Sequence, residues 1–83
     1  MENEIVAVLG LFDANQIIRI YKNDKCVKTV SCKMPELENV IFGLAIEFNT
    51  KKINLAGSDV IAQKVRRNFV TRYRNYNFDI NII

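Results

Sequence analysis

The first part of the chain shows the hydrophobic pattern of three consecutive β-strands. Residues 5–12 (IVAVLGLF) form a continuous apolar run, which is typical of a central strand covered on both faces. Two more strands are expected at residues 17–21 and 26–33, after polar turns at residues 13–15 and 22–25. Because both turns are short, we predict that the three strands form an antiparallel meander.

Residues 35–48 are predicted to form an amphipathic helix. Pro35 suits a first helical turn, and the carboxylates of Glu36 and Glu38 suit the exposed N–H groups there. Apolar residues then recur at helical spacing, at Leu37, Val40, Ile41, Leu44, Ala45 and Phe48. Since residues 40–48 (VIFGLAIEF) are also rich in β-formers, a strand is the alternative for this segment.

The remainder of the chain predicts a strand, a helix and a final strand. The first of these covers residues 53–56 and ends at Gly57, after which Ser58 can cap a helix over residues 59–75. The apolar face of that helix carries Ile61, Ala62, Val65, Phe69 and Tyr73, and the opposite face carries Lys64, Arg67, Thr71 and Arg74. Residues 78–82 alternate between apolar and polar side chains, which is typical of a half-exposed edge strand.

The predicted order of elements is strand, strand, strand, helix, strand, helix, strand. Residues 53–82 form a crossover unit, so its two strands should be parallel and its connection right-handed. We therefore expect an α/β (α+β) fold, with a mixed five-stranded sheet, residues 5–12 in its centre and two helices packed on it. A chain of 83 residues is expected to form a single domain, residues 1–83.

The positive charge is concentrated in the second half of the chain. The formal net charge is +3, but residues 51–76 hold seven lysines and arginines against one acidic residue, Asp59. Such an asymmetry favours an acidic partner, either nucleic-acid phosphate or an acidic protein surface. A solvated helix face explains the same charges equally well.

The composition also excludes several kinds of chemistry. Histidine is absent, so Ser-His and Cys-His nucleophile pairs, histidine-ligated zinc and histidine proton shuttles are excluded. Cys26 and Cys32 would lie about 20 Å apart in one strand, so we expect reduced, buried thiols on the same face of it. The three glycines are isolated, so there is no phosphate-binding loop, and we expect neither a cofactor nor a metal.

The sequence predicts no membrane partner, because it has no apolar run of the ~20 residues that a membrane span needs. Its first four residues are acidic where a signal peptide would be basic, so we expect a cytoplasmic protein. Abundant isoleucine, asparagine and lysine suggest an AT-rich genome, such as that of a phage or a mobile element.

The element order, with residues 8–15 (VLGLFDAN) and the strand and polar turn after them, resembles the ribonuclease H-like fold. In nucleases of that fold, acidic residues from the first strand and from later elements gather divalent metal. The resemblance implies that Asp13, Glu36 or Glu38, and Asp59 take those positions. However, Asp13 follows the strand instead of lying in it, and all four residues also suit solvated turns and helix starts. We therefore predict that the protein is not an enzyme, and a metal-dependent nuclease is the alternative that the resemblance implies.

We predict a small non-catalytic protein that binds nucleic acid or a nucleoprotein complex through its basic C-terminal helix. The residues expected to contact phosphates are Lys64, Arg66, Arg67, Arg72 and Arg74, and Tyr76 is expected to stack on a base.

The alternative is a protein–protein interaction module or an inhibitor of a host protein. Phe42 and Ile46 lie four residues apart and off the main apolar stripe of their helix, so they are predicted to form an apolar patch for another chain. The edges of the strands at residues 26–33 and 78–82 are further candidates. An open sheet edge also allows two copies to form a homodimer.

Overall fold

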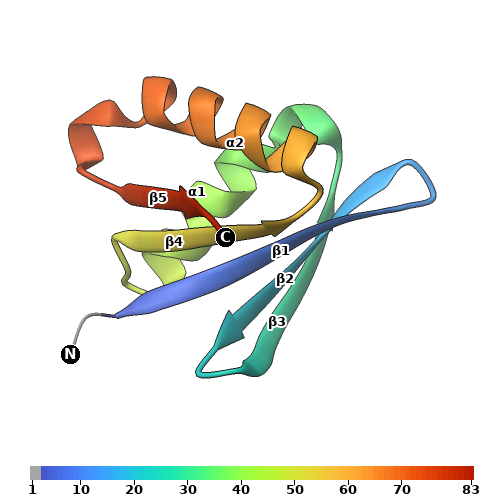
Figure 1. Cartoon of the computed structure of the whole chain (residues 1–83), viewed down its shortest axis with the longest axis horizontal. Coiled ribbons are helices and arrows are strands. Elements are labelled where there is room, and N and C mark those ends of the chain that lie inside the picture. Colours follow the sequence, from blue (N-terminus) through green and yellow to red (C-terminus); the bar gives the residue numbers. More distant parts are fainter. Residues whose placement is uncertain (1–2) are drawn as a thin grey trace.

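The computed structural model describes residues 3–83, which form a mixed five-stranded sheet and two α-helices (Figure 1). In chain order the elements are β1 (Glu4–Phe12), β2 (Asn15–Lys22), β3 (Lys25–Cys32), the 3-10 turn η1 (Met34–Glu36), α1 (Leu37–Glu47), β4 (Lys52–Gly57), α2 (Asp59–Arg72), the 3-10 turn η2 (Arg74–Tyr76) and β5 (Asp79–Ile82). The strand order is β3-β2-β1-β4-β5. The predicted α/β (α+β) class, the central position of β1 and the parallel pairing of β4 with β5 are confirmed.

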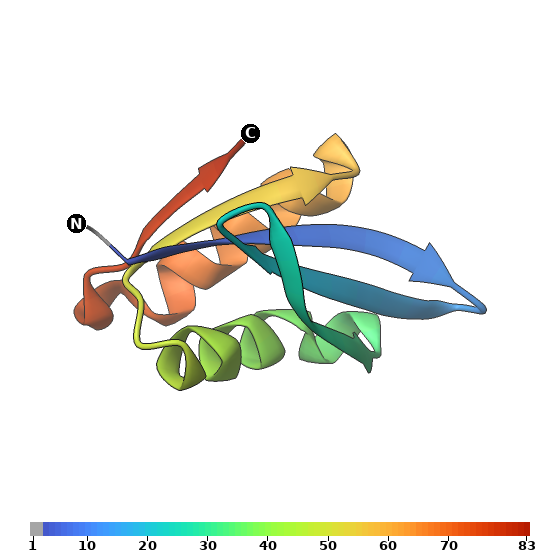
Figure 2. The same ribbon diagram turned by 90° about the horizontal axis from the view of Figure 1, so that it is seen from below.

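Both helices pack on the same face of the sheet (Figures 1 and 2). In β1, Ile5, Ala7 and Leu9 are buried, and they share one hydrophobic cluster with buried side chains of both α1 and α2. The intervening Val6 and Val8 lie on the other face, which we call the open face, and are only half-buried. The expectation that β1 is covered on both faces is therefore wrong, because both helices of residues 3–83 lie on one side of it.

Two-residue turns connect the first three strands. Both central residues of each turn have a positive φ: Asp13 (49°) and Ala14 (66°) after β1, and Asn23 (54°) and Asp24 (64°) after β2. Turns of this geometry match the right-handed twist of the paired strands. Asparagine and aspartate adopt positive φ readily, whereas alanine does so at a cost of about 1 kcal/mol. Ala14 is therefore a strained position at the tip of the β1–β2 hairpin.

Replacing Ala14 by glycine is expected to stabilise the fold by about 0.5–1 kcal/mol, because glycine has no Cβ to oppose a positive φ. Urea denaturation followed by circular dichroism measures the change in the free energy of unfolding. Asn23→Gly is the control in the other turn and should have a smaller effect, since asparagine already tolerates that conformation. Equal gains in the free energy of unfolding for both variants, or a loss for Ala14→Gly, would contradict the strain at Ala14.

A β-bulge in β3 changes which side chains face the helices. The register between β2 and β3 shifts at Val27, so that Cys26 lies opposite Tyr21 on the open face. Cys26 is exposed, whereas Cys32 is half-buried on the side of the helices. The prediction that both cysteines are buried on one face is therefore wrong, because a strict alternation of side chains does not allow for the extra residue.

The helices begin and end near their predicted positions, with two differences. Pro35 lies in η1, so α1 begins at Leu37 and has no proline in its own first turn. α2 ends at Arg72 instead of reaching residue 75, and Asn77, at φ 59°, turns the chain towards β5 after η2. Ser58 occupies the N-cap of α2, but its side chain makes no capping hydrogen bond. The helical prediction for residues 35–48 is confirmed, and the strand alternative is wrong.

Candidate nucleic-acid interface

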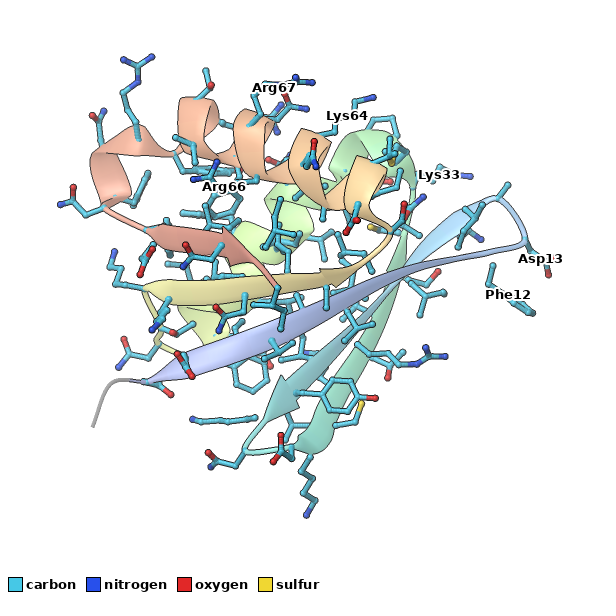
Figure 3. The ribbon with its side chains drawn as sticks, in the orientation of Figure 1. Phe12, Asp13, Lys33, Lys64, Arg66 and Arg67 are labelled. Atoms are coloured by element: carbon cyan, nitrogen blue, oxygen red, sulfur yellow. The ribbon has the colours of Figure 1, made fainter. Side chains whose placement is uncertain are left out.

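The outward face of α2 carries two cations that have no polar partner in the described part of the chain. Ala62, Val65 and Phe69 are buried and hold the helix against the sheet, so the opposite side of α2 faces solvent. Lys64 and Arg67 lie one turn apart on that side, are exposed, and have no polar partner within residues 3–83. Figure 3 shows both side chains projecting from the outer surface of the helix. Their predicted placement opposite the buried stripe is confirmed.

Arg66 points to the flank of α2 that faces β5. Its Nε donates a hydrogen bond to the main-chain oxygen of Ile80 at 3.0 Å, and Figure 3 shows the side chain beside β5. A carbonyl oxygen is a neutral acceptor, so the guanidinium keeps its full positive charge. Arg66 therefore adds to the positive potential of α2 while the sheet edge fixes its position.

Arg72 points to the opposite flank, towards α1. Its Nη1 donates to Asn39 Oδ1 at 2.9 Å, and the hydroxyl of Tyr73 donates to the same oxygen. Arg74 lies beyond the helix, in η2, and is exposed with no polar partner in the described part of the chain. None of the five predicted cations forms an ion pair with a carboxylate of residues 3–83. The structure thus distributes these cations over three sides of α2 and its C-terminal end.

Tyr76 belongs to an aromatic cluster where the end of α2, η2 and the segment before β5 meet α1. The cluster consists of Phe42, Phe69, Tyr73, Tyr76 and Phe78. The ring of Tyr76 makes a T-shaped contact with Phe42 at a centroid distance of 5.0 Å and stacks on Phe78 at 6.2 Å. Its side chain remains 47% exposed, so part of the ring is accessible to a base beyond the end of α2.

Phe42 and Ile46 do not form the exposed apolar patch that their spacing predicts. Phe42 is half-buried and stacks on Tyr73, with ring centroids 4.2 Å apart and an interplanar angle of 10°. Ile46, one turn further along α1, is 55% exposed. The spacing within the helix could not reveal this difference, because the rings that cover Phe42 come from residues 73–78.

The acidic residues that the ribonuclease H-like resemblance singles out are spread over the fold. Asp13 is at the tip of the β1–β2 hairpin, Glu36 is in η1 and Asp59 begins α2. Glu38 is only 8% exposed and accepts a hydrogen bond from Asn68 Nδ2 at 3.3 Å, so the expectation that it is solvated is wrong. Within residues 3–83, no three histidine, cysteine or acidic side chains are grouped so that they could hold a metal ion. These residues do not form the metal cluster that the resemblance implies.

The surroundings of Cys32 make its thiol harder to ionise. Burial raises the pKa of Cys32, and the negative charges of Glu36 and Glu38 raise it further. Because the thiolate is the form that reacts with electrophiles, a raised pKa makes a thiol less reactive near neutral pH.

Cys26 is expected to react with iodoacetamide at least about tenfold faster than Cys32 at about pH 8, because Cys26 is exposed, whereas Cys32 is half-buried and its pKa is raised. Mass spectrometry of the two cysteine peptides over time measures both rates in one sample. The alkylation rate of Cys32 should begin to rise at a higher pH in the folded protein than in the unfolded chain, because folding raises the pKa of this thiol. Equal rates for both thiols in the folded protein would contradict the described burial of Cys32.

A groove between α2 and β5 was not predicted from the sequence. It has a volume of about 610 Å³ and is lined by Gln63, Arg66, Arg67, Val70, Thr71 and Ile82. The pattern of residues 78–82 did indicate an edge strand. How α2 lies against that edge could be seen only in the structure.

Comparison of the chain with protein-family models, with curated proteins and with solved structures finds no match. No helix within residues 3–83 is long and apolar enough to cross a lipid bilayer.

Proposed function

We propose that this protein is a non-catalytic binding protein that holds the phosphate backbone of nucleic acid against α2. The observation that carries the proposal is the exposed position of Lys64 and Arg67, one turn apart and unpaired within residues 3–83. Phosphate oxygens accept charge-assisted hydrogen bonds from such side chains, and the counterions they displace add a favourable entropy. An outward pair of cations without carboxylate partners supplies the electrostatic part of such a contact.

The remaining cations extend this positive surface. Arg66 and Arg72 each give one donor to a neutral oxygen and keep their charge, and Arg74 continues the surface beyond the helix. Residues 60–78 contain no acidic side chain, so nothing within this segment neutralises the positive potential. Phosphates against the outward side of α2 can therefore contact Lys64 and Arg67, and phosphates at its flanks and C-terminal end can contact the other cations.

The proposal is tested by fluorescence anisotropy with a labelled duplex of about 20 base pairs, in a salt series from about 20 to 300 mM. With three to five phosphate contacts, the logarithm of the affinity should fall against the logarithm of salt with a slope of about −2.7 to −4.5. Because phosphate contacts carry no sequence information, duplexes of different sequence should bind within about threefold of one another. Binding that does not weaken with salt, or no binding at the lowest salt, would contradict the proposal.

A further inference from the structure

The outer edge of β5 presents main-chain groups that pair with no strand of residues 3–83. The amides of Asp79 and Ile83 donate to main-chain oxygens on the β4 side, at 2.7 and 2.9 Å. In a parallel pair, the intervening residues direct their N–H and C=O groups away from the neighbouring strand, so those of Ile80 and Ile82 face outward. The hydrogen bond from Arg66 Nε to Ile80 lies on this outer side. Within residues 3–83, β5 has β4 as its strand partner and no strand on its other edge.

This edge forms one wall of the groove between α2 and β5. Val70 is 45% exposed on the α2 side and Ile82 is half-buried on the β5 side, so both walls include apolar surface. Arg66 and Arg67 line the same groove and pair with no carboxylate of residues 3–83. The groove therefore combines a strand edge that has no partner strand within residues 3–83, apolar side chains and positive charge.

We infer that this groove binds an extended acidic segment of another protein, which adds to the edge of β5 as a sixth strand. Main-chain groups of the added strand pair with those of Ile80 and Ile82. Alternate side chains of the added strand face α2, where an apolar one meets Val70 and an acidic one meets Arg66 and Arg67. On binding, Ile80 exchanges its hydrogen bond from Arg66 for one from a peptide amide, which frees Arg66 for the peptide carboxylate.

Charge and hydrogen bonding distinguish this occupant from two others. A second copy of the chain would bring its own Arg66 and Arg67 to the same contact, where like charges repel. Nucleic acid supplies negative charge, but its backbone has no alternating N–H and C=O groups to pair with a strand edge. An acidic peptide satisfies both requirements. The inference does not depend on the proposed nucleic-acid contact, although Arg66 and Arg67 belong to both surfaces.

The probe for this site is a capped peptide of two Glu-Thr-Val-Thr repeats, which places glutamate and valine on one face of a strand. Titrated into ¹⁵N-labelled protein at about 150 mM salt, it should bind saturably and slow the hydrogen exchange of the Ile80 and Ile82 amides. Two further peptides carry N-methyl groups on main-chain nitrogens. One is methylated at its threonines, and the other at its glutamates and valines. At least one of them should bind about tenfold more weakly, because it cannot donate to the edge of β5. A peptide with lysine in place of glutamate should also bind about tenfold more weakly than the parent peptide.

The charges of the groove are tested by Arg66→Glu combined with Arg67→Glu. This variant should bind the glutamate peptide at least about tenfold more weakly, and it should bind the lysine peptide more tightly than the unaltered protein does. Lys22→Glu combined with Lys25→Glu changes the net charge equally at the β2–β3 turn and should change the affinity less than about threefold. The methylation series uses the unaltered protein, so it decides the question even where a variant does not fold.

Three results would overturn the inference. The first is that both methylated peptides bind as tightly as the parent peptide, which would exclude pairing with the strand edge. The second is that the parent peptide slows the hydrogen exchange of neither the Ile80 nor the Ile82 amide. The third is that the duplex of the anisotropy experiment, and not the peptide, protects the Ile82 amide, which would assign the groove to nucleic acid.

Discussion

Replacing Lys64 and Arg67 together by glutamate is expected to lower the affinity for duplex nucleic acid at least about 100-fold at about 50 mM salt. Each substitution removes a phosphate contact and places a negative charge where the phosphate would lie, so repulsion is added to the lost attraction. Neither side chain has a polar partner within residues 3–83, so we expect the fold to be unaffected. Fluorescence anisotropy measures the affinity, and circular dichroism checks the helix content.

Lys22→Glu combined with Lys25→Glu is the matched control, because it changes the net charge by the same amount. These lysines flank the β2–β3 turn, and in the strand order β3-β2-β1-β4-β5 that turn lies at the opposite end of the sheet from β5. The control variant should lose less than about fivefold in affinity. Equal losses for the two variants would show that net charge determines binding, and the proposed site on α2 would be wrong.

The largest loss of stability is expected for Gly57→Ala, about 3 kcal/mol. Gly57 ends β4 at φ +107°, and a Cβ added there would lie 2.2 Å from the main-chain oxygen of Leu9 in β1. An alanine must therefore push β1 and β4 apart or change the backbone conformation at residue 57. Either adjustment disrupts the parallel pairing next to the central strand. Urea denaturation measures the change in the free energy of unfolding.

Gly43→Ala is the control for this substitution, because no neighbour lies close to that position. Gly43 is exposed in α1, and a Cβ added there meets no heavy atom within 4 Å. Since alanine is the better helix former, the variant should be more stable by about 0.8–1 kcal/mol. If Gly57→Ala lowered the free energy of unfolding by less than about 1 kcal/mol, that result would contradict the close approach of β1 to β4 at Gly57.

The parts of the site that depend on neighbouring residues in the chain could be predicted. The apolar positions Ala62, Val65 and Phe69 determine which side of α2 packs on the sheet, so the helical period places Lys64 and Arg67 outward. The central position of β1 likewise follows from the meander on one side of it and the crossover unit on the other.

The parts that depend on residues far apart in the chain could not be predicted. Val6 and Val8 are as apolar as the buried positions of β1, and the sequence does not show that both helices lie on the other face. The hydrogen bond from Arg66 to Ile80 depends on how α2 meets the edge of β5. The burial of Phe42 depends on rings more than 25 residues away, so helical spacing alone predicted an exposed patch.

The register of the second hairpin was a further source of error. A single extra residue, Val27, moves Cys26 to the open face, and no composition signal marks its position. Strict alternation therefore assigned Cys26 to the wrong face, whereas Cys32 does lie on the side of the helices.

An NMR titration of ¹⁵N-labelled protein with the duplex tests the central claim most directly. At about 50 mM salt we expect the largest amide shift changes at residues 63–67 and 70–76, along the outward side of α2 and in η2, and we expect them to diminish as salt is added. Changes centred on Val8 and Tyr21 of the open face, with none along α2, would contradict the assignment of this helix as the nucleic-acid contact.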